Sequence, residues 1–325
     1  MSSMPLEVSA TTDARFVDTD AGFAELIDEL IDAPSYGFDT EFHRERTYFA
    51  KLALLQVAWP GGIAIVDPLK IDIAGLSAVF AGSGLAIVHA CDQDLEILER
   101  ACSRLPSRIF DTQVVAGFLG MSSPSLGSLV DRLLGLQMEK GDQLTDWTRR
   151  PLTDEQKRYA AGDVAYLHAL EAALRRRLES SGRIAWAEGE CALLLDSARR
   201  PVIPEESWWR LRQSRQFRGT QRGVAQEVAA WRERRAQVLD VPIRSVLSDL
   251  ALASIAYRPP KSRSDLEGVR GMDRRHLQGD SIAALLEAIE RGRALAPESL
   301  HLPPVGQESA SQRPAIALAL AYVAE

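Results

Sequence analysis

The chain has 325 residues, of which 46% are hydrophobic and 26% charged, and its formal net charge is −7. This length exceeds what one hydrophobic core usually serves, so two domains are expected. No apolar run reaches the roughly 18 residues of a membrane helix, the start lacks the features of a signal peptide, and the three cysteines suit neither a zinc site nor disulfides. We therefore expect a cytoplasmic protein with no membrane association.

The first part of the chain alternates between apolar strands and helices. Short turns join the first strands and helices separate the later ones, which predicts an α/β fold with a mixed sheet flanked by helices. The expected strands are one from Tyr36 onward, then 52–59, 63–68 and 85–90. The expected helices are 73–82, 92–102, 111–120, 125–135 and a long one from about 153 to 180. Residues 140–151 are expected to form a loop, and Thr153 with Gln156 a capping box.

The texture of the sequence changes near residue 200. A proline-containing stretch precedes basic helices expected at 222–240, 245–257 and 281–295, so this part is predicted to be all-α. Residues 200–295 contain 18 Lys+Arg and 12 Asp+Glu, a net of +6, which leaves −13 for the rest of the chain. An acidic first part and a basic second part indicate two different tasks.

Two acidic residues interrupt the first apolar strand. Asp39 and Glu41 are separated by Thr40 alone, and residues two apart in a strand share one face. Their carboxylates would repel each other unless a cation lies between them. Taken alone, the pair could equally be an edge-strand device that deters aggregation.

Two further acidic residues stand out. Asp94 lies in the first turn of a helix that follows a buried strand, where it could simply complement the helix dipole. Asp163 lies mid-helix among small residues, with Tyr159 one turn earlier on the same face. A mixed sheet would bring these positions together with the strand pair, and converging carboxylates need cations. An all-oxygen ligand set favours Mg²⁺ or Mn²⁺, and two such ions about 4 Å apart suit phosphoryl hydrolysis.

The ordered stretches "DTEF", "HACDQDLEIL" and "YAAGDVAYL" resemble the three motifs of the DEDD exonuclease superfamily. The tyrosine four residues before the last aspartate resembles the DEDDy branch. The longer stretches "DTEFHRERTYFAKLALLQVA", "IFDTQVVAGFLG" and "TDWTRRPLTDEQKRYAAGDVAYL" look like the ribonuclease D family. This resemblance covers roughly residues 30–180. Residues 229–272 further resemble the helical HRDC domain of that family.

The resemblance implies a ribonuclease H-like sheet followed by an HRDC domain. The expected boundaries are 1–200 for the exonuclease domain, 201–215 for a linker, 216–297 for the HRDC domain, and 298–325 for the start of a second, incomplete one. Either that second copy is absent or the sequence is a fragment. We expect a monomer.

The resemblance also implies a 3′→5′ exoribonuclease. It would release nucleoside 5′-monophosphates from RNA with a free 3′ end, notably tRNA precursors. The positions of Asp39, Glu41, Asp94 and Asp163 would hold two divalent metal ions. Tyr159 would orient the attacking water; because its ordinary pKa is near 10, acting as a base would need help from the metal site.

Basic and aromatic residues outside the acidic set are candidates for RNA binding. An aromatic residue among cations suits a stacked base and a phosphate, and a run of arginines suits a phosphate-tracking face. The candidates are Lys140, Trp147, Arg149, Arg150, Arg210, Arg212, Arg215, Arg218 and Arg222. Two alternatives stay open: an exonuclease acting on DNA, and a non-catalytic RNA-binding protein on the same fold, although the complete acidic set argues against the second.

Overall fold

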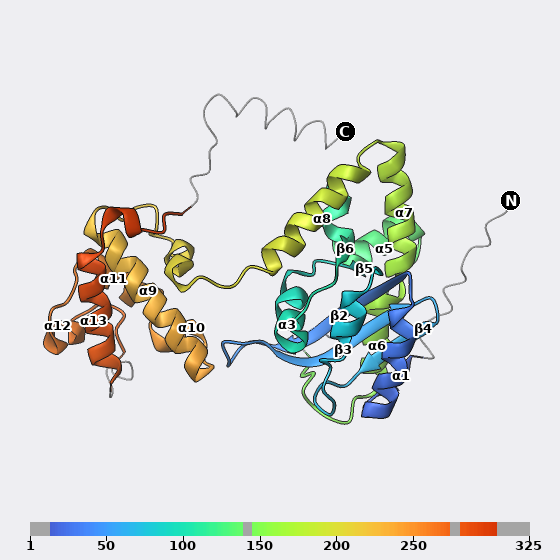
Figure 1. Cartoon of the computed structure of the whole chain (residues 1–325), viewed down its shortest axis with the longest axis horizontal. Coiled ribbons are helices and arrows are strands. Elements are labelled where there is room, and N and C mark those ends of the chain that lie inside the picture. The colour runs from blue at the N-terminus through green and yellow to red at the C-terminus, as the bar shows by residue number, and fades with distance from the viewer. Residues whose placement is uncertain (1–13, 139–144, 274–279, 304–325) are drawn as a thin grey trace. The chain divides into compact units, whose positions relative to one another are not determined.

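The computed structural model describes residues 14–138, 145–273 and 280–303 (Figure 1). It divides into two compact units. Among these residues, the first unit takes in the chain up to His43 and Lys51–Arg200, and the second takes in Arg44–Ala50 and the chain from Pro201 onward. In the part of the chain so described, no helix combines the length and the apolar character that crossing a membrane requires.

A six-stranded sheet forms the centre of the first unit, in the order β1-β4-β3-β2-β5-β6. β3 runs antiparallel to both β2 and β4, whereas β2, β5 and β6 are parallel to one another and β1 is parallel to β4. The strands are β1 (Arg15–Val17), β2 (Ser35–His43), β3 (Lys51–Trp59), β4 (Gly62–Val66), β5 (Leu85–Val88) and β6 (Arg108–Asp111). The predicted mixed sheet is confirmed.

Helices cover both faces of this sheet. They are α1 (Asp20–Ile31), α2 (Leu76–Ala81), α3 (Asp92–Cys102), α4 (Thr112–Gly117), α5 (Leu126–Leu134), α6 (Asp154–Ala165), α7 (Leu167–Ser180) and α8 (Ile184–Ala198). The largest core lies on the face that carries Phe38 and Val57. On the other face, α6 packs Ala160 and Ala161 against Leu54 of β3. Its small side chains let the helix approach the strands closely.

The long helix expected from about 153 to 180 is in fact two helices. α6 ends at Ala165, α7 begins at Leu167, and Tyr166 lies between them with φ −99° and ψ −5°. The two helices bury their apolar sides in different cores, α6 beside β3 and α7 in the large core through Leu170 and Leu174. The capping box of Thr153 and Gln156 is confirmed. β1, α1, β6 and α8 were not predicted.

In the described part of the second unit all regular elements are helices, and residues 44–50 form none. Its elements are η1 (Pro204–Arg210), α9 (Thr220–Leu239), α10 (Ile243–Val246), α11 (Asp249–Tyr257), α12 (Arg263–Glu267), α13 (Ser281–Ala294) and η3 (Pro297–Ser299). Helices α9 and α13 meet at two glycines: a Cβ on Gly223 would lie 2.3 Å from the carbonyl oxygen of Gly292. Residues 201–215, expected to be a linker, instead supply Trp208 and Leu211 to the buried core, because these large apolar side chains need cover.

Candidate active site

The alternation along β2 decides where its two acids point. Tyr36 and Phe38 face the large core, so Asp39 and Glu41 face the opposite side, which α6 covers. There they meet Asp163: one carboxylate oxygen from each of the three residues lies within 4.8 Å of the other two. The shared face predicted for the strand pair, and its approach to Asp163, are therefore present in the structure.

Asp163 reaches this point because α6 lies low over the sheet. Ala160, Ala161 and Val164 of the helix are all fully buried, so the residues around Asp163 fit between helix and strands without bulk. Because α6 ends at Ala165, Asp163 lies in the last turn of the helix, where the helix dipole disfavours a negative charge. At this position its carboxylate points toward those of Asp39 and Glu41.

Asp94 lies in the first turn of α3, directly after β5, and is only 7% exposed. Its carboxylate accepts a hydrogen bond from the hydroxyl of Thr40, which the alternation of β2 turns away from Asp39. Asp94 is not part of the three-residue group but is close enough to raise the pKa of Asp39 and Glu41. Thr40 was not identified as a functional residue from the sequence. Its position between the two acidic residues was the only signal.

The carboxylates have strongly perturbed acidities. Burial, with Asp163 and Asp94 adding their charge, raises the pKa of Glu41 to about 8. Burial raises the pKa of Asp163 to about 7 and that of Asp94 to about 6. Burial and the three neighbouring carboxylates raise the pKa of Asp39 well above its usual value. A buried acidic cluster of this kind holds protons at neutral pH unless cations replace them, and its all-oxygen chemistry fits Mg²⁺ or Mn²⁺.

Tyr159 lies one turn before Asp163 on α6. Its ring stacks on that of Trp147, with centroids 5.9 Å apart and planes at 29°. Burial and the charges of Asp163, Glu41 and Asp39 raise the pKa of Tyr159 to about 12. The hydroxyl is therefore protonated at neutral pH and is a hydrogen-bond donor to whatever occupies the space beside the carboxylates.

Gln56 was also not predicted from the sequence to lie at this site. It is the antiparallel partner of Asp39 in β3, so the two side chains lie on the same face of the sheet. Gln56 is fully buried, and neither its amide nitrogen nor its amide oxygen has a hydrogen-bond partner among the described residues. A buried unpaired amide costs about 1–3 kcal/mol.

The candidate RNA-binding residues of the loop before α6 have different surroundings. Lys140 lies outside the described residues. Arg149 is exposed, with its guanidinium 3.4 Å from Asp146. Trp147 is only 6% exposed and faces Tyr159, so its ring is not open to a stacked base. Arg150 is engaged inside the protein by Asp67, which leaves the expectation of RNA contact for Trp147 and Arg150 without geometric support.

The arginines expected to follow phosphates lie in the second unit, around the end of η1 and the start of α9. Four of them are exposed and the fifth is half-buried; in chain order they are Arg210, Arg212, Arg215, Arg218 and Arg222. Arg210 lies 3.9 Å from the carboxylate of Glu233. Arg218 donates to the carbonyl oxygens of Arg215 and Phe217, and Arg222 donates to that of Phe217. Contact of these arginines with phosphate stays a prediction.

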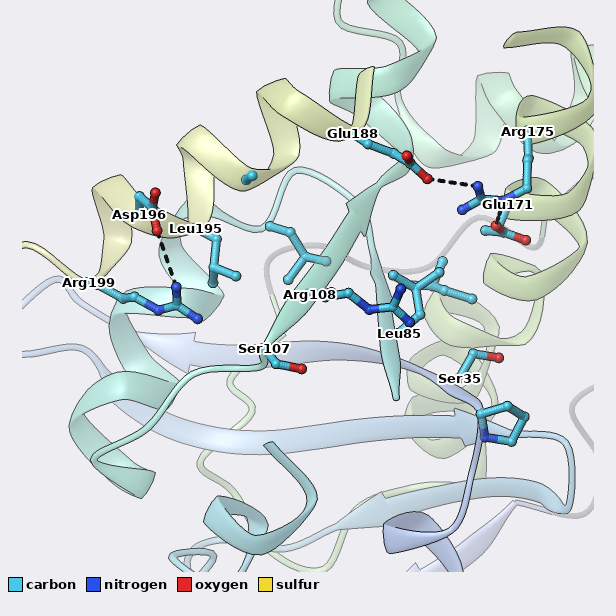
Figure 2. A pocket seen from close by; sticks show the side chains of 14 residues that line it. Ser35, Leu85, Ser107, Arg108, Glu171, Arg175, Glu188, Leu195, Asp196 and Arg199 are labelled. Atoms are coloured by element: carbon cyan, nitrogen blue, oxygen red, sulfur yellow. Dashed lines mark hydrogen bonds and ion pairs between the residues drawn. The ribbon is translucent and has the colours of Figure 1, made fainter. Parts of the chain in front are cut away.

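A cavity of about 580 Å³ in the first unit lies away from this acidic cluster. Figure 2 shows its wall, formed where β2, β5 and β6 begin and by α7 and α8. Most of its charged residues pair with one another: Arg175 binds Glu171 and Glu188, and Arg199 binds Asp196. None of the five predicted catalytic residues lines it. The residues predicted to be catalytic therefore lie outside this cavity.

Comparison with known proteins agrees with both units. A family of 3′-5′ exonuclease domains matches residues 14–179, and the HRDC domain family matches residues 221–289. Ribonuclease D of Acidiphilium cryptum is 35% identical over 301 residues, covering 90% of this chain and 76% of the relative. Ribonuclease D of Granulibacter bethesdensis is 36% identical over 299 residues, covering 91% and 75%.

Among solved structures, the fold resembles that of Escherichia coli RNase D, described as an exoribonuclease involved in structured RNA processing. The TM-score is 0.83 at 31% identity, and the match covers 95% of this chain and 83% of that one.

Proposed function

This chain belongs to the ribonuclease D family and is a 3′–5′ exoribonuclease, and from this premise we propose how its residues act and on which RNA. The substrate is structured RNA with a free 3′ end, notably tRNA precursors, from which the enzyme releases nucleoside 5′-monophosphates. The observation that carries the proposal is the approach of Asp39, Glu41 and Asp163 to within 4.8 Å through one oxygen each.

The enzyme family uses divalent metal ions, and Asp39, Glu41, Asp94 and Asp163 are the residues that would hold two of them, Mg²⁺ or Mn²⁺. Bound divalent ions neutralise developing charge on a phosphodiester and make water a better nucleophile. The raised pKa values support this assignment. They show that the ionised carboxylates are unfavourable next to one another, and a bound cation would stabilise the charged forms in place of a proton.

The remaining residues orient the reacting groups. Tyr159 donates a hydrogen bond that positions the attacking water; its pKa of about 12 favours this donor role over that of a general base. Thr40 fixes the rotamer of Asp94 through the hydrogen bond from its hydroxyl. Positioning of this kind lowers the barrier by restricting the reactants to a productive geometry.

The second unit supplies further contact with the RNA. Its exposed arginines, among them Arg212 and Arg215, bind phosphates and so add affinity that depends on salt. We take the enzyme to act as a monomer.

The proposal is tested by comparing two rates of degradation: that of an RNA with a single-stranded 3′ end and a label at its 5′ end, and that of a DNA of the same sequence. We expect stepwise shortening of the RNA and release of 5′-monophosphates. This activity should require Mg²⁺ or Mn²⁺ and should be abolished by a chelator. Asp39→Asn and Asp94→Asn should each slow hydrolysis by about 10³-fold or more. Asp92→Asn is the matched control, since Asp92 shares the first turn of α3 with Asp94 but is exposed. Equal rates on DNA and RNA would contradict the proposed substrate, and wild-type turnover by Asp39→Asn would contradict the proposed site.

A further inference from the structure

We propose that Arg150 is a positioning residue for Tyr159, acting through the loop that presses Trp147 against the tyrosine ring. This inference rests on the proposed role of Tyr159 and deepens it. The ring of Tyr159 is held by packing: it stacks on Trp147, and among the described residues no hydrogen bond to another side chain fixes its hydroxyl. The direction of that hydroxyl therefore depends on where Trp147 lies.

Arg150 fixes the backbone that carries Trp147. Its Nη1 donates to the carbonyl oxygen of Trp147 at 2.8 Å and to that of Arg149 at 2.9 Å. These two bonds fold the loop back onto its own guanidinium. The position of the indole follows from the position of Arg150.

The same guanidinium is anchored to the sheet. Its Nε donates to Oδ2 of Asp67 at 2.7 Å, and its Nη2 donates to Oδ1 of Asp67 at 2.7 Å and to the carbonyl oxygen of Ala53 at 2.8 Å. Asp67 directly follows β4 and is fully buried, while Ala53 lies in β3. The loop is thus tied to two strands of the sheet, and β3 is the one that pairs with the strand of Asp39.

The five hydrogen bonds use every N–H that an arginine has. None is left for a phosphate, so Arg150 has no donor to offer RNA in this arrangement. Burial by itself would raise the pKa of Asp67, but the hydrogen bonds from Arg150 and the backbone of Leu69 bring the pKa below its usual value. The carboxylate is therefore ionised at neutral pH, and both members of the bidentate pair are charged there.

Lysine cannot replace this device. It keeps the charge and can still pair with Asp67, but it lacks the planar fork that holds two strands and two loop carbonyls at once. Arg150→Lys should therefore free Trp147 and Tyr159 to shift while leaving the net charge of the loop unchanged. A displaced catalytic group costs about 10- to 100-fold in rate.

A double-mutant cycle in single-turnover hydrolysis of a short RNA tests the inference. Arg150→Lys should slow the chemical step about 10- to 100-fold with little change in the Kd for RNA. In the Tyr159→Phe background, the same substitution should have less than about a two-fold effect, because the hydroxyl through which it acts is gone. Arg175→Lys is the matched control: Arg175 also bridges two acids in the first unit, but beside the cavity of Figure 2. It should leave the rate unchanged.

The possible failures are distinguishable. If Tyr159→Phe itself left the chemical step unchanged, the proposed role of Tyr159 would be wrong. If Tyr159→Phe slowed the reaction but Arg150→Lys added its full effect on top, the inference about Arg150 alone would be wrong, and its role would be general stability, which Tm would show. If Arg150→Lys mainly weakened RNA binding with a shallower salt dependence, Arg150 would contact phosphate and the inference would again be overturned.

Discussion

The metal-free enzyme should become less stable as the pH rises from about 6 to 8. Glu41, Asp163 and Asp94 have raised pKa values in the folded protein, at about 8, 7 and 6. At a pH below the ordinary carboxyl pKa near 4, these three groups are protonated in both the folded and the unfolded chain, so the stability is fully present. As the pH rises, the unfolded chain releases these protons first while the folded protein retains them. The free energy of unfolding therefore falls through this window and stops falling above the folded pKa values.

The size of the effect follows from the number of retained protons. If the folded protein holds one proton more than the unfolded chain across two pH units, it loses about 2.7 kcal/mol of stability. The values for Glu41 and Asp163 place at least that one proton in the window between pH 6 and 8. For a unit of this size, the loss corresponds to a fall in Tm of about 5–10 °C. Mg²⁺ should reverse the loss and so raise the Tm more at pH 8 than at pH 6.

Thermal unfolding with a chelator and with Mg²⁺, followed across this range, is the assay. His89 and His168 have the opposite effect, because burial lowers their pKa and makes the folded protein less stable at low pH. The wild type is therefore compared with Glu41→Gln, which removes one repelling charge and should flatten the slope. A metal-free Tm that is constant or rises between pH 6 and 8, with no difference between the two proteins, would refute the reasoning.

Four further variants have defined outcomes. Tyr159→Phe should slow the chemical step with little change in RNA affinity; a main effect on affinity would make it a stacking residue instead. Arg212→Gln with Arg215→Gln should weaken binding of tRNA-sized RNA and lower its salt slope by about 2, while leaving turnover of a short oligonucleotide unchanged. Gly292→Ala should destabilise the second unit by about 1–3 kcal/mol in chemical denaturation, because the added Cβ would lie 2.5 Å from Cα of Val224. Gln56→Met should stabilise the metal-free protein by about 1 kcal/mol; a loss of stability would mean that the amide has a partner in solution.

The motifs carried most of what could be predicted about the site. Asp39 and Glu41 could be placed on one face because a strand repeats every two residues. Tyr159 and Asp163 could be placed on one face because an α-helix repeats every 3.6 residues, which puts residues four apart nearly in line. These are local rules, and the structure agrees with both. The role of Thr40 could not be predicted, because it depends on Asp94, which is 54 residues away in the sequence.

The expected RNA contacts of two loop residues lack geometric support for a related reason. Trp147 and Arg150 lie in a polar stretch expected to be a loop, and an aromatic residue with basic neighbours suggested contact with RNA. Their burial depends on Asp67 and Ala53, which belong to the sheet far earlier in the chain. The same holds for residues 201–215, where prolines suggested a linker but Trp208 is fully buried. Composition describes the segment, whereas its burial depends on partners that the segment does not contain.

The distance between the acidic residues along the chain has a consequence for synthesis. Asp39 and Asp163 are 124 positions apart, and α6 must reach the sheet before their carboxylates meet. A ribosome adds residues more slowly than a strand or helix forms, so the nascent chain passes through a long period with β2 complete and α6 absent. During that time it has no assembled site with which to degrade the messenger and ribosomal RNA around it. A ribosome-bound chain that ends before α6 should accordingly leave RNA intact, and nuclease activity should begin only once the last of the three acids has left the exit tunnel.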